Sequence, residues 1–71
     1  MSGYLVTAER RGRKVYWSRI VSKPSDPEVT AQVEWCWSDR SDAETFPVAA
    51  VAIGVANQLG GKAAGVEVEN A

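Results

Sequence analysis

Apolar and polar positions alternate along the first twenty residues in a pattern that predicts a β-hairpin. The segments 4–9 and 14–20 are rich in β-branched and aromatic residues. Between them, Gly12 is free to take the positive φ that a two-residue hairpin turn demands. With Arg11 and Gly12 as the loop, the predicted cross-strand pairs are Val6–Trp17, Ala8–Val15 and the oppositely charged Glu9–Lys14.

The clearest alternation lies in residues 29–37 and predicts a third strand with one buried side. The preceding segment, 22–28, contains two prolines and no apolar residue, so we expect a surface loop there. Within the strand, every second residue is apolar and shares one face. The residues on that predicted buried face are Val29, Ala31, Val33, Trp35 and Trp37.

A 3.6-residue repeat follows and predicts one helix that begins at Pro47 and ends before Gly60 and Gly61. Ser41 and Glu44 have capping-box spacing, but Pro47 disfavours helical geometry at the residue before it. We therefore expect a separate short turn over 42–45. The predicted core stripe of the helix consists of Val48, Val51, Ala52, Val55, Ala56 and Leu59.

Alternating apolar residues in 63–70 predict a fourth strand, which completes the order β-β-β-α-β. This order predicts a single α+β domain over residues 1–71, with an antiparallel sheet and one helix packed on one of its faces. The inward tryptophans and the valine stripe form the expected core. Three indoles and Phe46 are a large volume for one helix to cover, so we expect Trp37 to be partly exposed.

Composition narrows the chemistry that the chain can perform. The 71 residues are 45% apolar and 24% charged, and they include no histidine and one cysteine, Cys36. Histidine-based metal sites and Ser-His or Cys-His nucleophile pairs are excluded, as are an internal disulfide and a CxxC site. We therefore expect no enzymatic activity, no metal and no cofactor.

Charge is divided unevenly between the two parts of the chain. Residues 1–24 carry six basic and one acidic residue (net +5), whereas residues 25–71 carry two basic and eight acidic residues (net −6). Clustered arginines can bind phosphates or a patch of carboxylates, although a solvated surface turn can also carry such a cluster of basic residues. Tyr16, placed on the outward face, could stack a base. The predicted partner-binding residues are Arg10, Arg11, Arg13, Lys14, Tyr16 and Arg19.

The back of the predicted helix carries no charge, since residues 45–61 contain neither acidic nor basic side chains. An ordinary surface helix would carry them. Small residues around Ile53 permit another backbone to approach closely, so we predict self-association through this face, as a homodimer. A different partner, or an exposed alanine-rich helix, is the alternative. The predicted self-association residues are Ala49, Ala50, Ile53, Gly54 and Asn57.

Several short motifs resemble those of small proteins encoded by phages and prophages, and they span most of the chain. They are Tyr16-Trp17, Trp37-Ser38-Asp39-Arg40, Asp42-Ala43-x-x-Phe46, Ala56-x-x-Leu59-Gly60-Gly61 and Val66-Glu67-Val68-Glu69. Anti-CRISPR proteins are similar in size, composition and architecture. The resemblance implies an accessory inhibitor that binds one host protein or protein complex. It assigns no functional residue.

The leading hypothesis is therefore a non-enzymatic phage-type protein, of the anti-CRISPR kind, that binds and inhibits a host protein complex. The alternatives are a small nucleic-acid-binding module that uses the basic hairpin, and a structural phage component that oligomerises through the helix. The start of the chain lacks a secretion signal, and the uncharged segment 45–61 is shorter than the roughly 20 apolar residues that span a bilayer. We expect a location in the host cytoplasm, away from membranes, because the single cysteine suits a reducing compartment.

Overall fold

The computed structural model describes residues 3–22, 25–26 and 28–71, which form four strands, one α-helix and two short 3-10 helices. The elements are β1 (Tyr4–Arg10), β2 (Arg13–Ser22), β3 (Gln32–Ser38), η1 (Arg40–Asp42), α1 (Ala49–Gln58), η2 (Gly61–Ala64) and β4 (Val66–Asn70). All neighbouring strands pair antiparallel, in the order β3-β2-β1-β4. The α+β class and the order β-β-β-α-β are confirmed.

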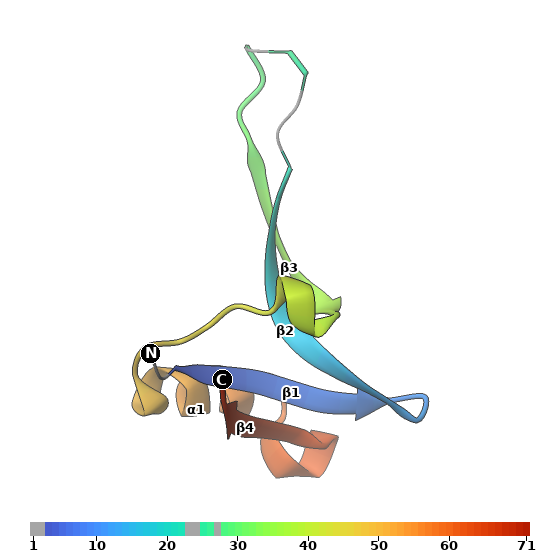
Figure 1. The fold of residues 1–71 in the computed structure, drawn as a ribbon, viewed down its shortest axis with the longest axis vertical. Coiled ribbons are helices and arrows are strands. Elements are labelled where there is room, and N and C mark those ends of the chain that lie inside the picture. The colour runs from blue at the N-terminus through green and yellow to red at the C-terminus, as the bar shows by residue number, and fades with distance from the viewer. Residues whose placement is uncertain (1–2, 23–24, 27) are drawn as a thin grey trace.

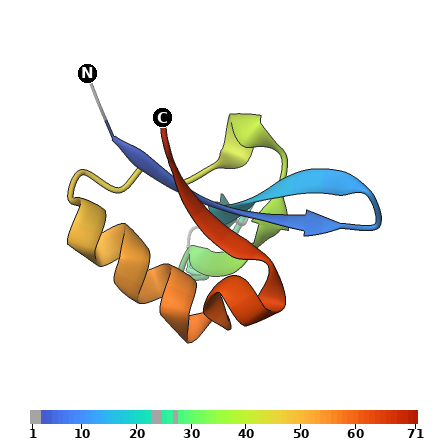
Figure 2. The same ribbon diagram turned by 90° about the horizontal axis from the view of Figure 1, so that it is seen from below.

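The sheet separates two layers (Figures 1 and 2). Helix α1 lies on one face, where Ala52 and Ala56 pack against Val6 and Val66. The 3-10 helix η1 lies on the other side of the sheet, beside β2 (Figure 2). We call these the helix-bearing face and the opposite face. Strand side chains alternate between them.

The first hairpin has the predicted register. Ala8 pairs with Val15, and Glu9 pairs with Lys14. Arg11 (φ 53°) and Gly12 (φ 75°) form the turn, and positive φ at both positions is the geometry that matches the twist of a hairpin. The ladder ends at Thr7–Tyr16, however, so the predicted Val6–Trp17 pair does not form. Beyond that point β2 bends away from β1.

Residues 43–46, which we call the strap, fill the wedge between the diverging strands. Tyr4 and Phe46 exchange two backbone hydrogen bonds of 2.8 Å, and the amide of Glu44 donates to the carbonyl of Trp17 at 3.1 Å. The predicted turn over 42–45 is therefore wrong. The 3-10 turn lies earlier, at η1, and the strap is extended because its backbone completes the hydrogen bonding of β1 and β2.

Strands β2 and β3 continue past the sheet as a two-stranded projection (Figure 1). We define the arm as residues 19–22 and 32–35. The third strand begins at Gln32, not at Val29, and its predicted buried face is largely exposed, which corrects the sequence prediction. Of the five residues on that face, only Trp37 is half-buried, as expected; Val29, Ala31, Val33 and Trp35 are exposed. No element of the described chain packs over the arm on that side.

Of the loop predicted over 22–28, residues 23, 24 and 27 lie outside the described residues. Ser22 belongs to β2, whereas Ser25, Asp26 and Glu28 are exposed. The Asp26 side chain accepts a hydrogen bond of 2.9 Å from the amide of Glu28. This local bond is typical of an aspartate that initiates a turn.

Helix α1 begins at Ala49, two residues after the predicted start. Phe46 is held extended by its pairing with Tyr4, and Val48 remains extended as well (φ −120°, ψ 126°), so the helix cannot begin at Pro47. Its predicted core stripe is only half covered. Ala52 and Ala56 are buried and Val55 and Leu59 are half-buried, but Val48 and Val51 are exposed.

The fourth strand is shorter than predicted, because residues 61–64 form η2 instead of extended chain. Within β4, Val66 is buried and Val68 is half-buried, and they lie opposite Ala8 and Val6 of β1. Val6, Ala8 and Val66, with Phe46, Ala52 and Ala56 from beyond the sheet, form the buried core cluster, and Val68 packs against it. The core therefore sits between α1 and the β1–β4 half of the sheet.

Candidate functional site

The residues predicted to bind a partner do not form one surface. By strand alternation, Arg10, Arg13 and Arg19 lie on the helix-bearing face, and Lys14 and Tyr16 lie on the opposite face. Arg11 stands at the tip of the turn and is exposed. Counting basic residues along the chain missed this division, because it depends on which strand positions share a side.

Two of these arginines are held by contacts within the chain. The Nη1 group of Arg10 donates to the carbonyl of Ala64 at 3.1 Å, and the guanidinium lies 5.5 Å from the centre of the Trp37 ring. Arg10 thus ties η2 and β3 to the end of the first hairpin. Arg13 forms an exposed ion pair with Asp39 at 3.6 Å. Among the described residues, the side chains of Arg11 and Arg19 make no hydrogen bond or ion pair.

Tyr16 is buried, with 9% of its surface exposed, so the base-stacking surface predicted for it is not available. Sequence alternation placed it correctly on the face away from α1. That face is covered at this point, because Arg40 lies 5.9 Å from the centre of the Tyr16 ring and Lys14 lies 5.8 Å from it. The covering segment is distant in sequence, so the local pattern carried no signal for it.

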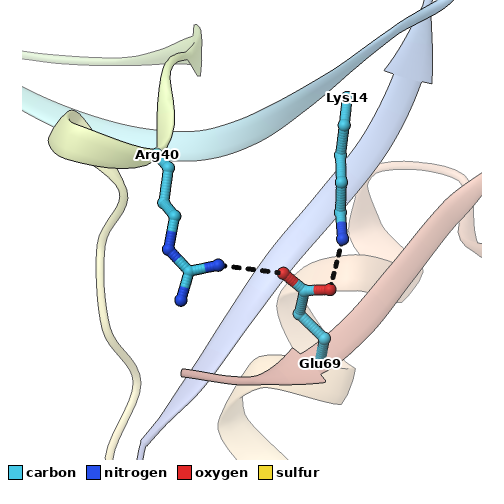
Figure 3. A network of polar contacts seen from close by, with 3 residues as sticks. All are labelled: Lys14, Arg40 and Glu69. Atoms are coloured by element: carbon cyan, nitrogen blue, oxygen red, sulfur yellow. Dashed lines mark hydrogen bonds and ion pairs between the residues drawn. The ribbon is translucent and has the colours of Figure 1, made fainter.

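An ion-pair network joins three elements on the opposite face (Figure 3). The Nζ group of Lys14 donates to Oε2 of Glu69 at 2.5 Å, and Nη1 of Arg40 lies 3.9 Å from Oε1. The hydrogen bond to Glu69 raises the pKa of Lys14 above its usual 10.5. Lys14 is directly opposite Glu9 as predicted, but its ionic partner is Glu69 of β4. The network therefore links β2, η1 and β4 and occupies the predicted contact residue Lys14.

A largely apolar groove of about 360 Å³ lies between α1 and the base of the arm. The Trp17 and Trp35 rings stack along one side, with centres 6.2 Å apart and planes 16° apart. Trp37 meets Trp17 edge-on at 5.1 Å. We call this feature the groove; its lining residues are Trp17, Trp35, Phe46, Val55, Gln58 and Leu59.

Exposed apolar residues extend from the groove in two directions. Val51, one helical turn before Val55, is 50% exposed. On the arm, Trp35 is 43% exposed and Val33 is 47% exposed. These are residues whose periodicity predicted the core. Both sets have the apolar periodicity of core residues, but in the folded chain they lie beside one groove that no described element covers.

The other flank of α1 carries the predicted self-association residues. Ile53 is 50% exposed and borders, with Asn57, Lys62 and Val68, a second cavity of about 370 Å³. Ala50, Gly54 and Asn57 are exposed and Ala49 is half-buried. The face is therefore accessible as required, and self-association through it stays a prediction.

In the described ranges, no group of three or more histidine, cysteine, aspartate or glutamate side chains is placed to hold a metal ion. None of the helices described is both long enough and apolar enough to cross a membrane. Comparison with protein-family models, curated proteins and solved structures finds no match.

Proposed function

We propose that this protein is a non-enzymatic binding protein that inhibits a host protein or protein complex by covering a functional surface, with the groove and its apolar margins as its contact surface. One observation carries the proposal. Residues patterned as core on both β3 and α1 line one groove, and the apolar residues next to it on each element, Val33 and Val51, are exposed together with Trp35. Contiguous apolar surface of this kind is typical of interaction sites in small soluble domains.

The residue types in the groove also suit protein recognition. Tryptophan is enriched among the residues that contribute most to binding energy at protein interfaces, and Trp35 presents part of its ring to solvent. Its stacking on Trp17 orders the ring before binding, which reduces the conformational entropy that a partner must remove. A partner surface with apolar side chains could therefore bury the Trp35 ring at little cost in conformational entropy.

The nucleic-acid alternative has less support from the arrangement of side chains. Tyr16 is buried, Lys14 is paired with Glu69, and Arg13 is paired with Asp39. Binding that depends on phosphate contacts needs cationic groups that are free to replace counterions. The first hairpin offers Arg11 at its tip and no continuous basic surface.

Two matched variants of α1 test the proposal. Val51 and Ile53 are each 50% exposed, but they lie on opposite flanks of the helix. Replacing either with lysine keeps a good helix-forming residue on the surface, so both variants should fold. In capture from host lysate followed by mass spectrometry, we expect one host component to bind wild type and Ile53→Lys and to be lost from Val51→Lys.

The captured component is then purified and titrated with each protein. We expect it to bind Val51→Lys at least about tenfold more weakly than wild type, because a lysine in the groove margin would lose its hydration on binding. Stoichiometric wild type should also inhibit the activity of the component. Equal binding by both variants, or loss from both, would contradict the groove as contact surface. Binding without inhibition would contradict the inhibitory role.

A further inference from the structure

Charged residues of the strands are segregated between the two faces of the sheet. The helix-bearing face carries three arginines and no acidic residue among the described strand positions, whereas the opposite face carries one lysine and four glutamates. The first set is Arg10, Arg13 and Arg19, and the second is Lys14, Glu9, Glu34, Glu67 and Glu69. The apolar groove therefore lies on the cationic side of a molecule whose total charge is −1.

Among the three arginines, Arg19 is the one placed to meet a ligand of the groove. Asp39, which follows β3, neutralises Arg13, and Arg10 is engaged by Ala64 and Trp37. Arg19 is exposed and lies directly opposite Trp35 on the arm, so its side chain borders the ring that lines the groove. An acidic group beside that ring would find a cation that pairs with no carboxylate among the described residues.

The uncovered part of the sheet has the width of one α-helix. Helix α1 packs on β1 and β4, and Trp17 and Trp37 of β2 and β3 are half-buried against the same core. Beyond these two rings, no described element covers the arm on this face. Two strands spaced about 4.8 Å apart present a strip about 10 Å wide, which matches the diameter of a helix with its side chains. An extended peptide is a poorer fit, because strands bind at sheet edges, where backbone groups are free, and not on a sheet face.

We infer that the groove receives an amphipathic α-helix of the partner protein, lying beside α1, with an aspartate or glutamate on the flank that meets Arg19. This inference rests on the proposed function and specifies the chemistry of its partner. The apolar stripe of that helix would cover Trp35, Val51 and Val55. A second copy of α1 does not fit this description, because residues 45–61 contain no acidic group to pair with Arg19.

The test uses a display library of helical peptides of about 18 residues, or five turns, in which apolar residues are fixed at i, i+3, i+4 and i+7 and all other positions vary. The library is selected on the immobilised full chain. We expect aspartate and glutamate to become enriched on one flank. On Arg19→Glu, the enrichment should switch to lysine and arginine. Lys62→Glu makes the same charge change beside the other cavity, and it should select the same peptides as wild type.

A selected peptide is then titrated by fluorescence anisotropy. We expect about tenfold weaker binding to Arg19→Glu, since charge reversal replaces an attraction with a repulsion, and restored binding when the acidic residue of the peptide becomes lysine. No enrichment, enrichment without an acidic flank, or binding unchanged by Arg19→Glu would overturn the inference. So would sedimentation showing a wild-type dimer that Trp35→Lys converts to a monomer.

The two proposals fail in different ways. If the host component depends on Val51 but selected peptides show no acidic preference, the inference about the helix is wrong and the binding function stands. If acidic peptides bind but no host component depends on Val51, the groove has the inferred chemistry and the proposed function is wrong.

Discussion

The β1–β4 half of the sheet and the arm share the same alternation of apolar and polar residues, yet only the first is buried. Val6 and Val66 are 0% and 2% exposed, whereas Val21 and Val33, which face one another on the arm, are 44% and 47% exposed. The difference does not lie in the strands themselves. It arises because α1 has ten residues and covers mainly β1 and β4, and among the described residues no helix lies over the arm.

This comparison teaches that an apolar period identifies a surface that is suited to burial, without identifying what buries it. In a chain of 71 residues, the covering element for one apolar face is present and the one for the other is absent from the described residues. A face that keeps a core-like pattern while exposed is costly to solubility and stability. The partner proposed above would cover this face.

The largest expected effect contrasts a covered with an open aromatic ring. Phe46 is 8% exposed, and Phe46→Ala should lower the free energy of unfolding by about 3 kcal/mol, since it leaves a cavity in the core. Trp35→Ala should cost only about 1 kcal/mol, mainly from lost stacking on Trp17. Urea unfolding of both variants measures the difference. Equal losses would show that the arm is packed as tightly as the body, which would break the comparison.

A second contrast concerns two glycines in different backbone settings. Gly12→Ala should destabilise the protein by about 1 kcal/mol, because alanine is strained at the φ of 75° that the first hairpin requires. Gly54→Ala should stabilise it by about 0.5 kcal/mol, because Gly54 is helical, exposed and has open space at its Cβ position. Thermal unfolding of the two variants shows whether each substitution raises or lowers the stability of the protein. A stabilising Gly12→Ala would contradict the turn geometry that starts the hairpin.

The smallest expected effect compares two ion pairs. Because hydrogen bonding to Glu69 raises the pKa of Lys14, this pair contributes stability that is fully present below pH 10.5 and is lost as pH rises through the raised pKa. The difference in unfolding free energy between wild type and Glu69→Gln should therefore shrink as the pH rises above 10.5. Asp39→Asn breaks the exposed pair with Arg13 and should have no measurable effect at any pH. A difference that persists at high pH would assign the role of Glu69 to other contacts.

Local rules were enough to predict much of this fold. The turn at Arg11 and Gly12 set the register of the first hairpin, and the change of period from two to 3.6 residues separated β3 from α1. The strap was missed because its hydrogen bonds to Tyr4 and Trp17 join segments that are far apart in sequence. Burial of Tyr16 was missed for the same reason.

The candidate site was predicted less well than the fold. The basic hairpin drew attention because its charges are adjacent in sequence, but strand alternation divides them between two faces and Asp39 and Glu69 pair with two of them. One signal for the groove was present, since three indoles and Phe46 exceed what a single helix covers. Which of them stay exposed depends on where α1 packs, and single-sequence patterns contain no information about that placement.

The most direct test of the central claim measures how accessible the two sets of apolar groups are in the free protein. Solvent relaxation enhancement by a soluble gadolinium chelate, recorded on methyl and indole signals at low protein concentration, reports this for each side chain. We predict strong enhancement at Trp35, Val33 and Val51, and weak enhancement at Val6 and Val66. If the Val33 and Val51 methyl groups were as protected as that of Val6, the arm and the groove would already be covered, and the account of an open binding face would be wrong.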